Sequence, residues 1–330
     1  MTKIFGSKAP SQYALDSVRA ARADQLATKT VQNWTKSRRS LPTAIRLDAG
    51  IANHWPARDQ YGRGTCVAFA TLAAVELHRA IREDMPPERL SEQFLHERMV
   101  SSHPLSQVEA ADIPEGGVLL RQALSALEQD GVVESAYAPY KPNTTRGGPR
   151  RELSPSFEAL QMAAGNRIQC RAYGTIGAPD GIDPNRVDNF QPGQETAKKM
   201  LDFLQDGMPV AVGVPLFQHP SGLNNWILPS TVFSGIVLCP EDADAPPLNG
   251  PRPDGHVVCL TGFQPDASEP HGGWFVFRNS WGLGFASHST NNPSGPTAGM
   301  RGYGLISASH INTYCWEYLV PVATDSGAAA

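Results

Sequence analysis

Apolar residues in the first half of the chain recur with the spacing of α-helices. In the run that follows Cys66 they fall three and four positions apart, which would place them on one face of a helix over residues 66–81. A similar run predicts a helix over residues 118–130, which a glycine would end. A third helix is expected before Gly207, and a more weakly patterned one between about 12 and 36.

The second half of the chain follows a different period. Short runs of β-branched and aromatic residues, bounded by glycine and proline, predict strands at 209–214, 231–238, 256–263, 274–279, 303–307 and 317–322. A helical half followed by a β-rich half indicates an α+β protein with a cleft between two lobes. Residues from both halves would meet at that junction.

Polar residues at these element boundaries form the pattern of a thiol hydrolase. Cys66 falls in the first turn of the expected helix, where unpaired backbone N–H groups and the helix dipole favour a thiolate. His256 could take the thiol proton, and the side-chain carbonyl of Asn279 could hold the imidazole in one tautomer. Gln60, upstream of Cys66, offers an amide N–H that could stabilise an oxyanion together with the Cys66 backbone N–H.

Segments around these residues occur in the order that is typical of one enzyme family. They span roughly residues 41 to 307. In chain order they are Gln60 to Cys66, Leu90-Ser91-Glu92-Gln93, Gly116-Gly117 with Tyr137 and Tyr140, Asn279-Ser280-Trp281-Gly282, and Gly302-Tyr303-Gly304. The chain resembles the papain-like cysteine peptidases, as a divergent, disulfide-lacking member of bacterial type.

The resemblance implies a papain-like two-lobed α+β fold. Residues 41–155 would form the mainly helical N-terminal lobe and residues 156–325 the antiparallel β-rich C-terminal lobe, with the active-site cleft between them. Residues 1–40 would be an N-terminal extension, either an inhibitory prosegment or a partner-docking arm. Residues 326–330 would be a flexible tail.

The resemblance also implies a function. The protein would be a cysteine peptidase that hydrolyses peptide bonds in a peptide or protein substrate through a thioester. The implied roles of nucleophile, general base and acid, orienting group and oxyanion donor belong to Cys66, His256, Asn279 and Gln60, in that order. For the substrate, Gly116 and Gly117 match glycines that pair with an extended peptide, and Trp281 matches the indole that shields the histidine–asparagine bond.

Several positions depart from the family pattern. Arg63 stands where secreted members carry a half-cystine, and Gly255 stands where many members have aspartate or asparagine. His256 follows Cys66 by 190 residues, against about 130–150 in papain-type sequences. We therefore expect insertions, for which the candidate segments are 141–155, 174–194 and 240–254. The last of these could cover part of the cleft.

The same residues admit other functions. A thioester at Cys66 can be captured by an amine, or can form from a glutamine side chain, so an acyltransferase or a deamidase is an alternative. A noncatalytic module could instead use the cleft to hold an extended peptide. Product mass separates the enzymes, because hydrolysis of a backbone amide splits the substrate chain and the other reactions do not.

Composition narrows the functional classes. With 330 residues, 41% hydrophobic and 18% charged, and a net charge of −4, the chain fits a single compact enzyme. It contains no glycine-rich phosphate loop and no basic stripe, so nucleic-acid binding is not expected. His256 and Cys259 would point to opposite faces of a strand, so neither a metal nor another cofactor is expected.

The sequence also bears on cellular location. It contains no apolar stretch of 18 residues, so no membrane span is expected, and no apolar run of signal-peptide length near its N-terminus. Its five cysteines lack the family's disulfide spacing, which favours a reducing compartment. We expect a cytoplasmic protein, although nonclassical export as an effector would leave the same pattern.

Overall fold

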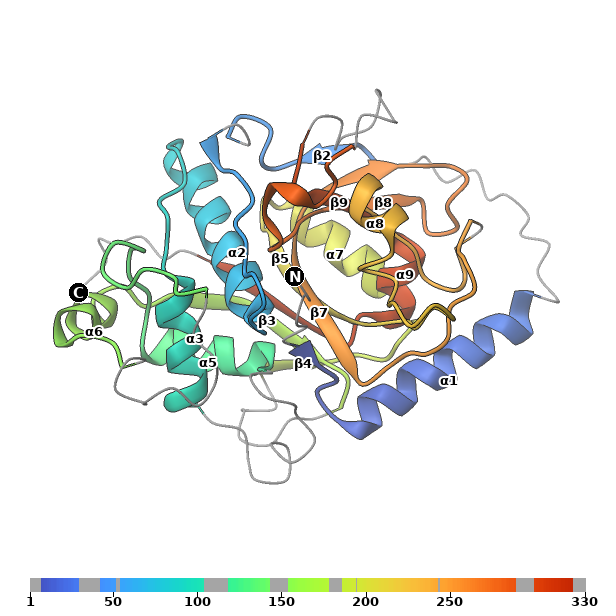
Figure 1. The fold of residues 1–330 in the computed structure, drawn as a ribbon, viewed down its shortest axis with the longest axis horizontal. Helices are drawn as coiled ribbons and strands as arrows, with labels where there is room; N and C mark the ends of the chain where they lie inside the picture. Colours follow the sequence, from blue (N-terminus) through green and yellow to red (C-terminus); the bar gives the residue numbers. More distant parts are fainter. Residues whose placement is uncertain are drawn as a thin grey trace.

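The computed structural model describes residues 7–29, 42–51, 54–103, 118–142, 154–177, 186–193, 195–242, 244–288 and 300–322. Within these ranges, one group of helices lies beside a large sheet, and other helices and loops lie on its far side (Figure 1). The arrangement is the two-lobed α+β architecture that the sequence predicts.

The helical lobe is built around α2 (Cys66–Glu83), most of whose side chains are buried. This helix contacts the sheet on one side and other helices on the other, which explains why its apolar positions extend around most of its circumference. The neighbouring helices are α3 (Glu92–Ser101), α5 (Leu120–Gln129) and α6 (Phe157–Ala164). The predicted helices over 66–81 and 118–130 are confirmed as α2 and α5.

Gly131 ends α5 as the sequence predicts. Its φ of 85° lies in the left-handed region that favours glycine. A Cβ at this position would lie 1.9 Å from the carbonyl oxygen of Ala163, at the end of α6. Glycine therefore provides both the turn and the close approach of α6.

The strands of the β-rich lobe form a single sheet. They are β1 (Ser7–Lys8), β2 (Ile45–Arg46), β3 (Gln169–Thr175), β4 (Val187–Asn189), β5 (Val210–Pro215), β6 (Ile236–Val237), β7 (Asp254–Pro265), β8 (Gly273–Arg278), β9 (Tyr303–Ser307) and β10 (Glu317–Val322). Their order is β4-β3-β10-β5-β7-β8-β9-β6, with β1 and β2 added to β7. The pairs β3–β4 and β6–β9 are parallel, and the other pairs are antiparallel.

Five of the six predicted strands are confirmed, as β5, β7, β8, β9 and β10. The predicted strand at 231–238 is largely wrong, because α8 (Pro229–Ser234) occupies its first half and only β6 remains. Pro229 starts this helix and Gly235, with φ of 80°, ends it. The other helices of the lobe are α7 (Thr196–Gln205), which confirms the helix expected before Gly207, and α9 (Ala308–Tyr314). None of the described helices has both the length and the apolar character needed to cross a membrane.

β7 separates two hydrophobic cores. Val257 and Cys259 belong to the core that includes α2, whereas Val258 and Leu260 belong to the core on the other side of the sheet. This alternation follows from the two-residue period of a strand. It places His256 on the same face as Val258, away from the body of α2.

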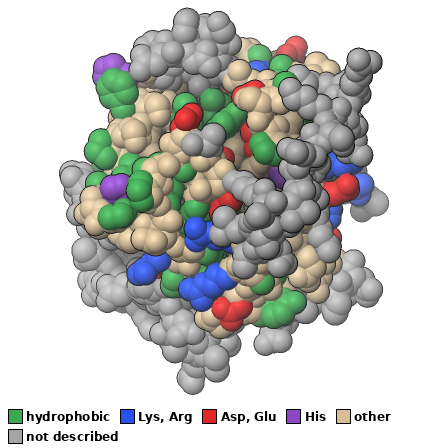
Figure 2. Space-filling view, turned by 90° about the vertical axis from the view of Figure 1, so that its right-hand side faces the viewer, with side chains coloured by type: hydrophobic (Ala, Val, Ile, Leu, Met, Phe, Trp, Pro, Cys, Tyr) green, Lys and Arg blue, Asp and Glu red, His purple; other side chains and the backbone are tan. Residues whose placement is uncertain are grey.

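An N-terminal helix, α1 (Gln12–Lys29), runs along the outside of the β-rich lobe, at the lower right of Figure 1. It buries Ala14, Leu15 and Val18 against that lobe. Figure 2 views the molecule from this side, where basic side chains gather in the lower half of the face. The helix expected between about 12 and 36 is confirmed as far as Lys29, and its remainder lies outside the described residues.

Candidate active site

The side chains of His256 and Asn279 meet at the ends of two adjacent strands. His256 is near the start of β7, and Asn279 directly follows β8. Nε2 of His256 lies 2.9 Å from Oδ1 of Asn279. The same oxygen accepts the backbone N–H of Ser280 at 2.8 Å, which turns the amide oxygen toward the imidazole. Nε2 is therefore the protonated nitrogen, and Nδ1 is the one that can accept a proton.

Two indole rings enclose the imidazole. The ring centroids of His256 and Trp281 are 4.9 Å apart with a 36° tilt, and those of His256 and Trp226 are 4.7 Å apart at 73°. His256 has no exposed surface and Trp281 is 4% exposed. The rings exclude water from the bond between His256 and Asn279, and this strengthens the bond.

The loop that contains Gln60 is paired with the loop that contains Asn279. The backbone N–H of Gln60 donates to the carbonyl of Ser280 at 2.8 Å, and that of Gly282 donates to the carbonyl of Arg58 at 2.9 Å. The Ser280 hydroxyl donates to Oε1 of Gln60 at 2.5 Å. Nε2 of Gln60 donates to the carbonyl of Arg63 at 2.6 Å. The amide nitrogen of Gln60 thus faces the turn that leads into Cys66.

Cys66 is the first residue of α2, directly after Thr65. The hydroxyl of Tyr140 lies 2.8 Å from Oγ1 of Thr65 and donates to the carbonyl of Gln60 at 2.9 Å. Burial raises the pKa of Tyr140 to about 12, so this hydroxyl keeps its proton. The turn before Cys66 is thereby held at both ends, and the helix dipole favours a negative charge at the Cys66 position.

The five cysteines all lie within the described residues and form no disulfide. Burial raises the pKa of Cys315 to about 12, and it also raises the pKa of the other thiols outside α2. These residues are Cys170, Cys239, Cys259 and Cys315. Cys66 differs from them in its place at the start of a long helix.

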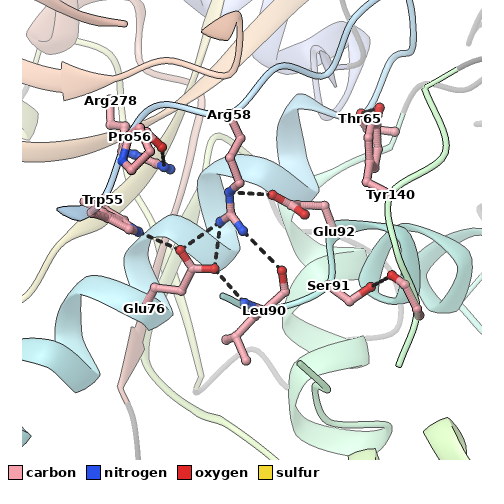
Figure 3. A network of polar contacts seen from close by, with 11 residues as sticks. Trp55, Pro56, Arg58, Thr65, Glu76, Leu90, Ser91, Glu92, Tyr140 and Arg278 are labelled. Carbon is pink, nitrogen blue, oxygen red and sulfur yellow. Dashed lines mark hydrogen bonds and ion pairs between the residues drawn. The ribbon is translucent and has the colours of Figure 1, made fainter. Parts of the chain in front are cut away.

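A buried ion network fixes the Gln60 loop to the helical lobe (Figure 3). The guanidinium of Arg58 donates to both carboxylate oxygens of Glu76 at 2.7 and 2.8 Å, and it lies 2.8 Å from Glu92. Burial alone would lower the pKa of Arg58, but the two carboxylates raise it above its ordinary value. Trp55 and the backbone of Leu90 also donate to Glu76, each at 2.8 Å. These bonds hold Arg58 against α2 and α3. The loops of Gln60 and Asn279, which are paired next to Arg58, are thereby held in the same position.

A second buried guanidinium precedes Asn279. Arg278 lies over the ring of Trp55 at 4.0 Å and donates to the carbonyl of Pro56 at 2.6 Å. Burial lowers the pKa of Arg278. The end of β8 is therefore attached to the segment that precedes Arg58, and Asn279 is held from both sides.

Arg63 links the loop before Cys66 to neighbouring segments through polar bonds. Its guanidinium donates to Oε1 of Gln93 at 2.7 Å and to the carbonyl of Lys141 at 2.8 Å. It also lies 4.9 Å from the ring centre of Tyr140. Arg63 thus joins the loop before Cys66 to α3 and to the segment at 140–141. Because the side chain is partly exposed, this link is weaker than a covalent bond.

The glycine before His256 has a steric reason. A Cβ at Gly255 would lie 2.2 Å from the ring of Trp316 and 2.7 Å from the carbonyl of Val214. Trp316 is fully buried. An aspartate or asparagine at this position therefore has no space in this protein, and the indole of Trp316 fills the volume.

The N-terminal segment pairs with the strand that contains His256. β1 lies antiparallel to the start of β7, with Ser7 opposite Gly255, and the N–H of Ala9 donates to the carbonyl of Pro253 at 3.0 Å. Further along, Arg22 in α1 forms an ion pair with Glu241 at 3.1 Å. The segment 240–254 is thus part of the surface on which residues 7–22 dock, together with the start of β7 and α9.

The structure brings together the predicted residues to different extents. His256 and Asn279 are bonded directly, Gln60 is linked to Asn279 through Ser280, and Cys66 follows the Gln60 loop. Trp281 is buried beside His256. The predicted substrate-binding residues Gly116 and Gly117 lie outside the described residues.

Some residues that shape the site were missed by the sequence analysis. They are Trp226, Arg58 and Trp316. The hydrogen bonds made by Ser280 and Tyr140 were also missed. Ser280 and Tyr140 lie in recognised segments, so their presence was noted but their bonding was not. Trp226 has no local signal, because it reaches His256 only through the packing of the β-rich lobe.

No protein-family model and no curated protein matches the chain. Among solved structures it is similar to xylellain, a cysteine protease from Xylella fastidiosa, with a TM-score of 0.55, 18% identity and coverage of 86% of this chain and 87% of that one. A structure from work on the mite allergens Blo t 1 and Der p 1 gives a TM-score of 0.52 and 18% identity, covering 88% of this chain and 74% of that one. The proform of Amb a 11, a cysteine protease and ragweed pollen allergen, gives a TM-score of 0.51 and 17% identity, covering 88% and 67%.

These likenesses extend over most of the chain at low identity. They show that the chain has the papain-like two-lobed fold, as its sequence motifs predict. Within this fold His256 and Asn279 lie next to the loop that leads to Cys66.

Proposed function

We propose that the protein is a cysteine peptidase that hydrolyses peptide bonds through a thioester at Cys66. The observation that carries this proposal is the 2.9 Å contact of His256 Nε2 with Asn279 Oδ1, beside the loop that leads into Cys66. An imidazole held in this tautomer offers Nδ1 as the base. The papain-like fold supports the same reaction class.

In the first half of the reaction, the Cys66 thiol loses its proton to Nδ1 of His256 and attacks the scissile carbonyl carbon. The carbonyl oxygen becomes an oxyanion, for which the Cys66 backbone N–H and the Gln60 amide are the proposed donors. The imidazolium of His256 then protonates the leaving amine. The C–N bond breaks and the thioester remains.

In the second half, His256 takes a proton from water, and the resulting hydroxide attacks the thioester carbonyl. The carbon–sulfur bond breaks, the carboxylic product leaves and the Cys66 thiol regains its proton from the imidazolium. Asn279 acts throughout as a positioning residue, because its oxygen accepts the Nε2 proton of His256 in both half-reactions.

We place residues 1–40 in the same proposal, as an inhibitory arm. Two observations support this role over a docking function for another protein. Residues 7–9 pair with the segment directly before His256, and α1 docks on the insertion 240–254 of the same chain. In addition, Cys66 and His256 have no exposed surface in this form of the protein. Removal of the arm is expected to uncover the start of β7.

Intact-mass labelling with an epoxysuccinyl inhibitor at about neutral pH tests both parts of the proposal. The samples are the full chain and a form that starts at Leu41, each with Cys66 and with the Cys66→Ala change. We expect one label per molecule of the shorter form, and none after Cys66→Ala, because the thiolate attacks the epoxide. The full chain is expected to label at least about tenfold more slowly, since strand pairing must open first.

The outcomes separate the two parts. Equal labelling of the two wild-type forms removes the inhibitory role of the arm and leaves the activated thiol in place. If neither wild-type form is labelled while both are folded by circular dichroism, the peptidase proposal fails. Labelling that persists after Cys66→Ala would assign the reactive thiol to another cysteine.

A further inference from the structure

Three side chains capable of binding a metal come together away from the proposed catalytic residues. Cys239, Asp242 and His310 place one ligand atom each within 4.8 Å of the others. Cys239 and His310 are fully buried, and Asp242 is partly buried. The cluster lies where the insertion 240–254 begins, next to α9.

Strand topology explains why these residues meet. β6 and β9 are parallel neighbours, with Val237 opposite Ile306. Chain segments that leave adjacent parallel strands emerge at the same edge of the sheet. Cys239 and Asp242 follow β6, and His310 follows β9, so the three side chains lie at one edge.

His310 is the unusual member of the cluster. Both ring nitrogens are buried and neither has a partner in hydrogen-bond geometry, although the Val237 carbonyl lies near the ring. Phe217 and Tyr314 pack on its ring, with centroid distances of 5.8 and 5.6 Å. A neutral imidazole has one nitrogen lone pair that it can give to a metal ion. A buried polar group without a hydrogen bond destabilises the folded state.

We propose that Cys239, Asp242 and His310 bind a Zn²⁺ ion. A thiolate, an imidazole and a carboxylate are the ligand types that this borderline-soft cation prefers, and three protein ligands leave a fourth position for water. The ion would give a ring nitrogen of His310 a bonding partner. It would also connect the three buried side chains through one metal centre.

The geometry requires a small contraction. Zn²⁺ bonds of about 2.0 to 2.3 Å place tetrahedral ligand atoms about 3.3 to 3.8 Å apart. Because the three atoms lie within 4.8 Å of one another, they need to approach by at most about 1 to 1.5 Å. Rotation of the three side chains supplies this movement. Cysteine binds Zn²⁺ as a thiolate, so the ion must displace the proton from the Cys239 sulfur on binding.

Asp242 is already positioned as a ligand. Its Oδ2 accepts the backbone N–H of Cys239 at 2.7 Å, and its Oδ1 accepts the hydroxyl of Ser307 at 2.9 Å. A carboxylate has about four lone-pair sites, so both bonds can persist when one oxygen binds the ion. Ser307 thus becomes the outer partner that orients a ligand carboxylate.

The ion would join two parts of the β-rich lobe. Cys239 directly precedes the segment 240–254, Asp242 lies within it, and His310 belongs to α9. Glu241, which directly precedes Asp242 in this loop, accepts the hydroxyl of Tyr314 at 2.6 Å and pairs with Arg22 of α1. The metal link therefore supports the surface on which the N-terminal helix docks.

The test uses the full chain with Cys66→Ala, which removes the other thiol–imidazole pair that could compete for the ion. The protein is stripped with a chelator and titrated with Co²⁺ and then with Zn²⁺. We expect one equivalent of Co²⁺ to produce a thiolate-to-metal charge-transfer band and intense tetrahedral d–d bands, and Zn²⁺ to abolish both. The thermal unfolding midpoint of the same chain should rise with Zn²⁺ concentration and fall again with chelator.

Three further substitutions assign the ligands, and one serves as a control. Cys239→Ser should remove the charge-transfer band, and His310→Gln or Asp242→Asn should weaken Zn²⁺ binding at least about tenfold, because loss of even an outer partner costs 10–100-fold. Cys170→Ser, at a cysteine outside the cluster, should leave both values unchanged. Near-ultraviolet circular dichroism checks that each variant is folded.

The proposal is overturned by any of three results. They are the absence of a charge-transfer band in the folded Cys66→Ala chain, a band that survives Cys239→Ser, and a band that Cys170→Ser removes. If the ligand variants fail to fold, the decision rests on the unfolding midpoint of the Cys66→Ala chain, and a midpoint that does not respond to Zn²⁺ rejects the site.

Discussion

Two buried histidines in this protein differ in what surrounds their ring nitrogens. His256 contacts Asn279 at 2.9 Å and lies between two indoles, whereas neither ring nitrogen of His310 is hydrogen-bonded. Both residues have no exposed surface. Burial is therefore not what separates them. The two residues differ instead in the groups that contact the ring nitrogens. An oriented imidazole can transfer a proton in a fixed direction, while one without a hydrogen-bond partner is available to bind a ligand.

Their neighbouring sulfur atoms differ in the same way. Cys66 opens the long helix α2, where the helix dipole favours a thiolate. Cys239 lies in a loop beside Asp242, and its pKa is raised by burial first and by the acidic neighbours second. A nucleophilic thiol needs an environment that favours the thiolate, such as the helix start at Cys66. The buried, acidic surroundings of Cys239 keep its thiol protonated until a cation replaces the proton.

The largest expected effect comes from exchanging each histidine for glutamine. In the form that starts at Leu41, His256→Gln should lower the rate of Cys66 labelling and the hydrolysis of fluorescein-labelled casein by at least about 10⁴-fold, because the base is lost. His310→Gln should leave both rates within about threefold, since it has no part in proton transfer. Equal losses in the two variants would erase the distinction between the sites.

A smaller effect is expected when His256 loses its orienting partner. Asn279→Ala should lower the rate of casein hydrolysis by about 10²-fold, within the range of a positioned acid–base group, because the imidazole can then rotate and change tautomer. Asn279→Asp keeps an oxygen acceptor and should recover most of the loss. Measurement of both variants distinguishes a positioning role from a structural one. If Asn279 acted only through the stability of the fold, restoring an oxygen acceptor with Asn279→Asp would not restore activity.

Much of the first site could be predicted from the sequence. Cys66 sits at the boundary of a strongly periodic helix, and His256 and Asn279 lie at the ends of two runs that the strand period identifies correctly. Each residue therefore has a local signal. The order of segments then relates them to one fold, although the sequence cannot supply the rings of Trp226 or the ion network of Arg58, which depend on tertiary packing.

The second cluster had no such signal. Cys239 and Asp242 follow a predicted strand at 231–238 whose first half is helix α8, and His310 lies on α9, which has only seven residues and was not predicted. Their meeting depends on the parallel pairing of β6 with β9, which has two paired positions. Short elements and a non-local pairing carry too little periodicity to be inferred from the chain.

The smallest expected effect lies at Ser307, which touches the second cluster without belonging to it. Its hydroxyl oxygen accepts the backbone N–H of His310 at 3.0 Å as the cap of α9, and its hydroxyl donates to Asp242 at 2.9 Å. Ser307→Ala should lower the free energy of unfolding by about 1 kcal/mol, the usual cost of a lost cap. Urea unfolding in the presence of chelator measures this value. Ser307→Thr, which keeps the hydroxyl, is the control.

The same substitution then sharpens the comparison between the sites. If Asp242 is a ligand, Ser307→Ala should also weaken Zn²⁺ binding by about tenfold, because an outer partner of the ligand is lost. Labelling of Cys66 in the form that starts at Leu41 should not change, since Ser307 makes no bond to His256, Asn279 or Gln60. A loss of labelling without a loss of Zn²⁺ affinity would mean that the cap acts on the β-rich lobe as a whole, and the two buried histidines would then belong to one cooperative unit.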